Sequence, residues 1–397
     1  MATYKEQNKL NVPHLRFPEF HGEWEEHGLS EYLDFKNGLN PDSKRFGKGI
    51  KFISVMDILN NPVITYDCIR ASVQATDAEM SSFSVENGDI LFQRSSETLE
   101  DVGRANVYID DKVAVFGGFV IRGKKKANYN PLFFRYLLSS PYARKRIIPM
   151  GAGAQHFNIG QEGLSKVLLN FPSIEEQTKI ASLLHLLDER IATQSKLIEK
   201  LESLIKGIVD CTILRKEKNA IVGDVCSISE QIRAEANIDD IITVRLHGNG
   251  VCKSSAENLQ LGATQYYRRR AGQLIYGKQN FHNGAIGIVP ISLDNGITSK
   301  DIPSFDIDEM KCNSVYLLAQ LQSPQYYKPA EALTTGTGSK RLKEETFLKL
   351  PIVLPNKREQ DNIAVLIHRA SMNLDHAKRL LELLSIQKQF LLRQMFI

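Results

Sequence analysis

The 397-residue sequence contains little cysteine and no cysteine pattern that stabilises a fold. Its five cysteines are odd in number and widely spaced, and no CxxC pair occurs; they are Cys68, Cys211, Cys226, Cys252 and Cys312. Disulfide frameworks and structural zinc sites both need closely spaced pairs, so the spacing argues against both. We expect a protein of the reducing cytoplasm.

Long hydrophobic runs are also missing. No stretch approaches the roughly 18 apolar residues that a membrane-spanning helix needs, and Met1 to Leu10 is polar. The sequence therefore predicts neither a membrane span nor a signal peptide. Hydrophobic residues make up 42% and charged residues 24%, as in ordinary globular proteins. At roughly 150 residues per domain, the length predicts two or three domains.

A strong excess of positive charge is absent as well, because the formal net charge is only +4. The basic residues gather locally instead, at Lys124–Lys126, Arg144–Arg146, Arg268–Arg270 and Lys340–Arg341. Each cluster could face a phosphate backbone or could simply be a solvated surface.

The usual catalytic motifs are missing too. The sequence has no GxxxxGK[ST] loop, no HExxH pair and no GxSxG turn. Asn130 to Phe133 resembles the Asn-Pro-Pro-Tyr/Phe loop of adenine methyltransferases, but it lacks the second proline, and no glycine-rich turn accompanies it. We therefore predict no catalytic residue, no metal site and no cofactor site in this chain.

What the sequence does contain is the same plan twice. Five short segments recur in the same order, 183 to 185 residues apart. The pairs are Gly88–Phe92 with Gly272–Tyr276, Ser140-Pro141 with Ser323-Pro324, Gly151–Gly153 with Gly336–Gly338, Phe171-Pro172 with Leu354-Pro355, and Glu176-Gln177 with Glu359-Gln360. One such echo would be chance, but five in order indicate a duplicated unit.

The duplication is clearest in two heptad patterns. Apolar residues recur at alternating steps of four and three at Ile180, Leu184, Leu187, Ile191, Ile198, Leu201, Ile205 and Ile208, with Gln194 as the polar member. The second pattern lies 183 residues later at Ile363, Ile367, Leu374, Leu381, Leu384 and Leu391, with Ala370 and Ala377 between them and Lys388 as its polar member. A 3.5-residue period predicts helix-on-helix packing, whereas a surface helix against a globular core would drift from it.

These patterns predict an α+β fold with two similar α/β domains, separated by two long antiparallel helices in a coiled coil with a pseudo-twofold internal repeat. We place the first domain at 1–172, a central helix at 173–217, the second domain at 218–355 and a C-terminal helix at 356–397. Each helix would be about 60 Å long. A second helix parallel to the first would require the second domain to return the chain along that whole length, and a domain of this size is too small to do so. We therefore expect the helices to be antiparallel.

The chain resembles a known family, the DNA specificity subunits of type I restriction-modification systems. The resemblance rests on Pro13 to Phe20 with Gly22-Glu23-Trp24, and on the boundary Leu168 to Gln177 with Lys179-Ile180. The boundary returns at Leu350 to Gln360. The order of domain, helix, domain and helix at a fixed offset is more specific than any one motif.

The resemblance implies that each domain is a target-recognition domain that reads one half of a bipartite sequence in double-stranded DNA. It also implies that the helices set the half-site spacing and dock two methyltransferase subunits, and that restriction-translocase subunits join the complex. S-adenosylmethionine, ATP and Mg would then bind the partner subunits, and this chain would be a non-catalytic specificity subunit.

Arg, Gln and Asn suit base edges and Lys suits phosphates, so we predict DNA contacts among polar residues of both domains. In the first domain they are Lys44, Arg45, Lys48, Gln93, Arg94, Arg104, Lys124, Lys125, Lys126, Gln155 and His156. In the second they are Arg245, Arg268, Arg269, Arg270, Lys278, Gln279, Asn280, Lys340 and Arg341. Any one of them could instead be ordinary surface.

Two other functions remain open from the residues alone. A protein-interaction scaffold would bind no duplex even with partners present, and the small net charge is compatible with it. A self-contained methyltransferase would bind S-adenosylmethionine as the isolated chain, which calorimetry would detect.

An insertion tests whether the helices set the spacing. Four residues inserted within Ser195 to Leu204 should lengthen the gap between the two half-sites and leave both half-sequences unchanged, because only the connector grows. The recognised sequence, determined before and after insertion, checks this. Altered half-sequences would show that the helix is not a spacer.

Overall fold

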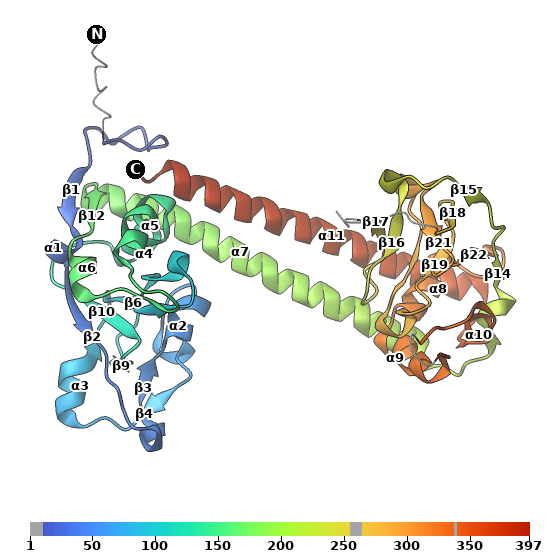
Figure 1. Cartoon of the computed structure of the whole chain (residues 1–397), viewed down its shortest axis with the longest axis horizontal. Helices are drawn as coiled ribbons and strands as arrows, with labels where there is room; N and C mark the ends of the chain where they lie inside the picture. The colour runs from blue at the N-terminus through green and yellow to red at the C-terminus, as the bar shows by residue number, and fades with distance from the viewer. Residues whose placement is uncertain (1–10, 255–263, 337–339) are drawn as a thin grey trace, which may run out of the picture. The chain divides into compact units, whose positions relative to one another are not determined.

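The computed structural model describes residues 11–254, 264–336 and 340–397 (Figure 1). The chain divides into two compact units. The first unit comprises residues 1–194 with 380–397, and the second comprises residues 195–379. Within the described residues, no helix is long and apolar enough to cross a membrane.

Two four-stranded sheets form the head of the first unit. The central sheet is antiparallel, in the order β2 (Leu33–Asn37), β10 (Val120–Lys125), β6 (Ile90–Gln93) and β8 (Ala105–Val107). The other sheet has the order β4 (Ser72–Val73), β3 (Phe46–Ile53), β9 (Ala114–Phe116) and β5 (Ser84–Val85), with β3 parallel to β9. A turn at Gly117 and Gly118 separates β9 from β10, so the apolar run Val113 to Ile121 is divided between the two sheets.

The second unit repeats the central sheet. Its order is β14 (Cys226–Ile228), β22 (Ser304–Ile307), β19 (Leu274–Tyr276) and β20 (Ile286–Ile288). The registers agree as well: Phe92 faces Ile121 in the first unit, and Ile275 faces Ser304, 183 residues later, in the second. The predicted duplication is therefore present in strand order and in pairing.

Shorter elements complete both heads. Those of the first unit are α1 (Leu29–Tyr32), α2 (Val55–Asn60), α3 (Asp77–Phe83), α4 (Pro131–Ser139), α5 (Pro141–Ile147), α6 (Gln161–Ser165) and the paired strands β1 (Glu25–Gly28) with β12 (Leu168–Phe171) and β7 (Ser95–Ser96) with β11 (Phe157–Asn158). Those of the second unit are β13 (Ala220–Ile221) with β23 (Pro351–Ile352), β16 (Ile242–Val244) with β17 (Val251–Lys253), β15 (Arg233–Ala234), β18 (Tyr266–Arg268), β21 (Ile297–Ser299), α8 (Ser314–Leu321), α9 (Pro324–Tyr327) and α10 (Glu344–Leu348).

Two long helices follow the heads in sequence. The helix α7 spans Ile174–Val209 and continues as a short π-helix over Asp210–Leu214, and α11 spans Lys357–Gln394. Their starts are capped, because the Ser173 hydroxyl accepts a hydrogen bond from the Glu176 N–H (3.4 Å) and the Asn356 side chain accepts one from the Glu359 N–H (3.0 Å). Acidic side chains in the first turn add a favourable interaction with the helix dipole.

The contacts inside each unit show that α7 and α11 are antiparallel. In the first unit, Lys388 pairs with Asp188 at 2.5 Å. In the second unit, Lys378 pairs with Glu202 at 2.8 Å. Residue numbers thus rise along α7 as they fall along α11, as we predicted. All the predicted seam residues lie at buried or half-buried positions.

The core of the first unit joins its head to both long helices. Ile180 and Leu184 of α7 are buried in one cluster with Leu384 and Leu391 of α11, and Trp24 of the head belongs to the same cluster. The Leu15 N–H donates to the Gln394 carbonyl oxygen (2.9 Å), so the segment before β1 lies against the end of α11. The first head therefore folds against the last residues of the chain.

Candidate nucleic-acid interface

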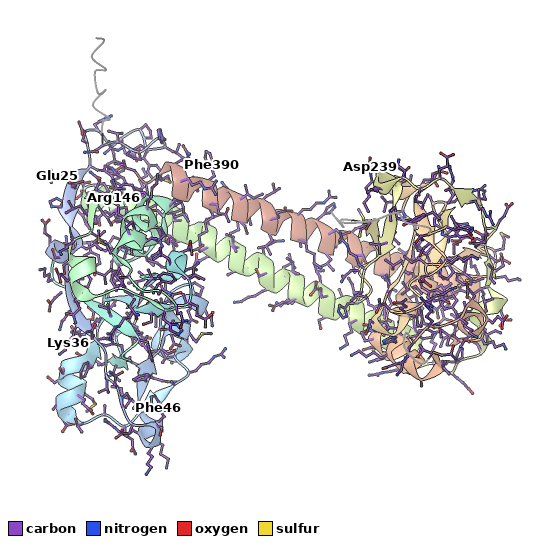
Figure 2. The ribbon with its side chains drawn as sticks, in the orientation of Figure 1. Glu25, Lys36, Phe46, Arg146, Asp239 and Phe390 are labelled. Carbon is purple, nitrogen blue, oxygen red and sulfur yellow. The ribbon has the colours of Figure 1, made fainter. Side chains whose placement is uncertain are left out.

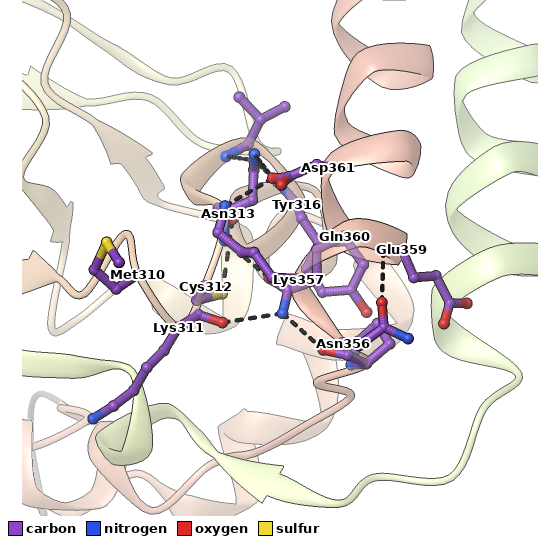
Figure 3. Close-up of polar contacts among 12 residues, drawn as sticks. Met310, Lys311, Cys312, Asn313, Tyr316, Asn356, Lys357, Glu359, Gln360 and Asp361 are labelled. Carbon is purple, nitrogen blue, oxygen red and sulfur yellow. Dashed lines mark hydrogen bonds and ion pairs between the residues drawn. The ribbon is translucent and has the colours of Figure 1, made fainter.

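A buried glutamine ties each head to the start of its long helix (Figure 3). The Gln360 Oε1 accepts from the Asn313 N–H (2.9 Å), and its Nε2 donates to the carbonyl oxygen of Pro355 (2.8 Å). Gln177 makes the same two contacts in the first unit, to Asn130 (3.1 Å) and Pro172 (3.0 Å). The repeated Glu-Gln boundary thus fixes the orientation of the head on the helix.

The two asparagines held by these glutamines are helix caps. The Asn130 side chain accepts from the Phe133 N–H (3.0 Å), with Pro131 in the first turn of α4. The Asn313 side chain accepts from the Val315 N–H (3.0 Å) at the start of α8. Capping accounts for the Asn130 to Phe133 segment that resembled a methyltransferase loop.

A hairpin loop recurs at the same place in both heads. Ala152 and Asn158 exchange two backbone hydrogen bonds of 2.9 Å, and Thr335 and Arg341, 183 residues later, exchange bonds of 2.9 and 3.0 Å. We call residues 152–158 in the first unit, and residues 335–336 with 340–341 in the second, the hairpin loops; residues 337–339, which include part of the Gly336–Gly338 echo, lie outside the described residues. Gly153 and Gly336 have φ values of +145° and +128°, which favour glycine at both positions.

One cationic residue lies beside each hairpin loop. The Arg94 carbonyl oxygen accepts from the Ile159 N–H (2.9 Å), and its N–H donates to the Phe119 carbonyl oxygen (2.9 Å). Lys278 makes the equivalent backbone bonds, both 2.9 Å, to Leu342 and Asp301. The structure therefore assembles Arg94 with Gln155 and His156, and Lys278 with Lys340 and Arg341, in two equivalent sites.

The side chains of the two sites differ. In the second unit the three cations of the site are each paired: Lys278 with Glu344 (2.6 Å), Arg341 with Asp301 (3.3 Å) and Lys340 with Glu331 (3.5 Å). The neighbouring Gln279 and Asn280 are exposed.

In the first unit the site is less charged. The Arg94 guanidinium donates to the Gly118 carbonyl oxygen (3.2 Å), and Ser95 hydrogen-bonds Asn158. Gln155 and His156 are exposed at the tip of the loop.

A second group of predicted residues lies near the first hairpin loop. Lys44 and Lys48 are exposed on either side of Phe46, which lies at the start of β3 (Figure 2). Phe46 and Ser95 line one pocket, so this group borders the Arg94 site.

Arg45, between the two lysines, is engaged within the head. It hydrogen-bonds Glu79 (3.0 Å) and the Gln74 carbonyl oxygen (2.9 Å). The hydrogen bond from Arg45 lowers the pKa of Glu79 to about 2, so the pair stays ionised at neutral pH.

The other exposed or half-exposed candidates are not joined to the hairpin sites. Most have partners within their own head. Lys124 pairs with Glu86 (3.2 Å), Arg104 pairs with Asp101 (2.5 Å), and Lys125 donates to the Tyr129 carbonyl oxygen (3.2 Å). Arg268 and Arg270 line a pocket of about 390 Å³ together with Glu230 and Asp306. Lys126 and Arg245 are exposed.

Two predicted DNA contacts are buried, and the structure contradicts those predictions. Arg269 is 0% exposed, and its guanidinium donates to Thr298 (2.7 Å), Ser304 (2.8 Å) and the Ile302 carbonyl oxygen (3.0 Å). Burial lowers its pKa to about 10. Gln93 is buried as well and donates to the Ser95 carbonyl oxygen (2.9 Å). Both side chains support the strands instead of facing a ligand.

Sequence reasoning missed the apolar residues beside the first hairpin site. Phe119, Met56 and Phe46 are all exposed around the pocket that Ser95 also lines. The predicted DNA contacts were all polar residues. The one available signal was Phe119 directly after Gly117-Gly118, because paired glycines often mark a turn that presents its next side chain.

Comparisons with known proteins agree with this architecture: two heads with equivalent sheets, each tied to a long helix, define a duplicated two-domain fold. A crystal structure of a type I restriction-modification S subunit from M. genitalium matches with a TM-score of 0.65 and 14% identity, covering 97% of this chain and 99% of that one. At that identity the likeness is one of fold.

Sequence comparisons point to the same kind of protein. Residues 21–203 match the model of the type I restriction modification DNA specificity domain. The type I restriction enzyme MjaVIII specificity subunit of Methanocaldococcus jannaschii is 19% identical over 92% of this chain and 89% of its own length. A putative MjaX specificity subunit of the same organism is 25% identical over 53% of this chain, and the match spans 49% of that relative. The chain is therefore similar to the DNA specificity subunits of type I restriction-modification systems.

The burial of Arg269 predicts a sharp difference within one basic cluster. Arg269→Ala should lower the free energy of unfolding by about 3 kcal/mol, because it removes the donors for three buried acceptors. Arg268→Ala and Arg270→Ala, at exposed neighbouring positions, should each change it by about 0.5 kcal/mol or less. Denaturant unfolding of the three variants measures this, and equal effects would contradict the interior role of Arg269.

Proposed function

We propose that this chain is the DNA-recognition subunit of a type I restriction-modification complex and that each head reads one half of a bipartite target. The observation that carries the proposal is the recurrence of a hairpin loop beside a cationic residue, Arg94 or Lys278, in two otherwise diverged heads. A shared frame with different side chains suits two different half-sequences, since base edges are read by particular side chains while cations on phosphates set position.

Exposed apolar residues on the long helices support docking of methyltransferase subunits. In the first unit Leu186 and Leu383 are each 63% exposed and Phe390 is 55% exposed. Figure 2 shows where Phe390 lies on α11. In the second unit Leu204 and Leu366 are each 52% exposed. Solvent-exposed helices seldom carry so many large apolar side chains unless a partner covers them.

The remaining functions then belong to the partner subunits. Adenine must leave the base stack to be methylated, so an associated methyltransferase flips it while the heads hold the duplex. S-adenosylmethionine, ATP and Mg bind those methyltransferase and restriction subunits, and this chain acts without a catalytic site of its own, in the cytoplasm. A scaffold that never touches DNA would not need a hairpin loop with a cationic residue beside it in both heads.

Salt-dependent binding tests the DNA proposal. In the complex with its methyltransferase, Arg94→Ala and Lys278→Ala should each weaken binding to the target duplex. The slope of log affinity against log salt should become shallower by about 0.9 for each phosphate that the variant no longer neutralises. Fluorescence anisotropy across a salt series measures both quantities.

The control is Lys166→Ala, on a side chain that pairs with Glu162 at 2.6 Å beside α6; it should leave the slope unchanged. Equal affinity of the wild-type complex for target and random duplexes at physiological salt would overturn the proposed function.

Docking on the helices makes a separate prediction. Leu383→Glu should weaken association with the methyltransferase at least 10-fold, because a charge would replace an apolar contact. Glu382→Gln, a change at the adjacent exposed residue, serves as the control. Analytical ultracentrifugation of the mixed subunits measures it, and unchanged assembly by Leu383→Glu would place the docking surface elsewhere.

A further inference from the structure

The turn between β9 and β10 presents an exposed aromatic side chain, Phe119, on a hydrogen-bonded backbone. The Gly117 N–H donates to the Ile53 carbonyl oxygen (3.0 Å), the Val120 N–H donates to the Gly117 carbonyl oxygen (2.8 Å), and the Arg94 N–H donates to the Phe119 carbonyl oxygen (2.9 Å). Phe119 is nevertheless 69% exposed. The backbone is anchored on both sides while the ring faces solvent, so the turn presents the ring to a ligand.

Phe119 borders an apolar pocket of about 430 Å³. Phe46, Phe52 and Met56 line it, and Gly117 and Gly118 form part of its wall. Met56 is 60% exposed and Phe46 is 43% exposed, with the Phe46 ring edge-on to Phe52 at 5.2 Å. Phe119, Met56 and Phe46 thus leave a large apolar surface exposed to solvent instead of packing it in the core.

Cationic residues adjoin residues that line this pocket, and they favour a nucleic-acid ligand. Lys44 and Lys48 are exposed beside Phe46. Arg94 contacts Gly118 in the pocket wall through its guanidinium (3.2 Å). Ser95, which also lines the pocket, leads directly to the hairpin loop through Asn158. An apolar pocket with Arg94 against its wall, next to the proposed DNA site, matches a base edge beside a phosphate.

We propose that this pocket reads the 5-methyl group of a thymine in the half-site bound by the first head. Thymine is the only one of the four bases that presents a methyl group in the major groove. Phe119 with Met56 and Phe46 supplies the apolar contact, and Arg94 positions the adjacent backbone. This inference rests on the proposed DNA-binding function.

The second head has different chemistry at the equivalent place. Asp301 occupies the position of Phe119, because its carbonyl oxygen accepts from the Lys278 N–H as that of Phe119 accepts from Arg94. Its carboxylate pairs with Arg341 at 3.3 Å. A carboxylate–guanidinium pair offers no apolar contact to a methyl group, so thymine reading of this kind belongs to the first half-site.

Deoxyuridine substitution tests the proposal directly, since deoxyuridine is thymine without the methyl group. The target is first selected from random duplexes by the complex with its methyltransferase. Each thymine of the first half-site is then replaced in turn. We expect one replacement to weaken wild-type binding about 5-fold, the value of one buried methyl group. The Phe119→Ala complex should bind the thymine and deoxyuridine duplexes equally.

Two controls make the result specific. Val113→Ala, at an exposed apolar residue outside the pocket lining, should keep the full 5-fold sensitivity. Replacements in the second half-site should affect wild-type and Phe119→Ala complexes alike. Thermal unfolding verifies that both variants fold.

The outcomes separate the inference from the function it rests on. Sequence-specific binding that ignores every deoxyuridine of the first half-site, or equal sensitivity in wild type and Phe119→Ala, overturns the thymine pocket alone. If Phe119→Ala instead abolishes assembly with the methyltransferase, the pocket holds a protein side chain and the inference is wrong. Failure to select any sequence overturns the proposed function together with the inference.

Discussion

The antiparallel packing of α7 against α11 is the constraint on which both units depend. Neither unit has a long helix to itself, because each combines parts of α7 and α11. In the first unit, Asp188 of α7 accepts hydrogen bonds from Arg135 (3.2 Å) and Tyr136 (2.9 Å) of α4 and pairs with Lys388 of α11. Asp188 thus connects a head to both helices. It also neutralises Lys388, which is the one charged residue of the second heptad pattern.

The two heads share the same structural framework but differ in their exposed side chains. The central sheet, the glutamine at each helix start, the capping asparagine and the hairpin loop recur at nearly constant offset. The exposed positions have diverged, most clearly where Phe119 in one head corresponds to Asp301 in the other. This division follows from physics, since buried contacts are coupled to their neighbours while exposed side chains change at little cost in stability. It leaves two heads of one fold that present different chemistry to a ligand.

The sequence predicted the features that depend on periodicity and repetition. The heptad seams and the equivalence of the two heads follow from regular spacing, and the direction of α11 follows from the length of the helices compared with the size of a head. The site was harder to predict, because burial depends on contacts between distant strands. Arg268, Arg269 and Arg270 look alike in sequence, yet the middle one lies inside among Thr298 and Ser304. Phe119 is the opposite case. An aromatic residue in an apolar run would be expected in the core, yet Phe119 is exposed.

A base-resolution map of methylated adenines tests the central claim most directly. The chain would be expressed with its methyltransferase in cells that lack other adenine methylation, and the genomic DNA would be sequenced. Our account predicts one motif in two parts, separated by a gap of constant length and arbitrary sequence, with unlike halves. A single contiguous motif, or two identical half-sequences, would contradict a protein that reads DNA with two diverged heads.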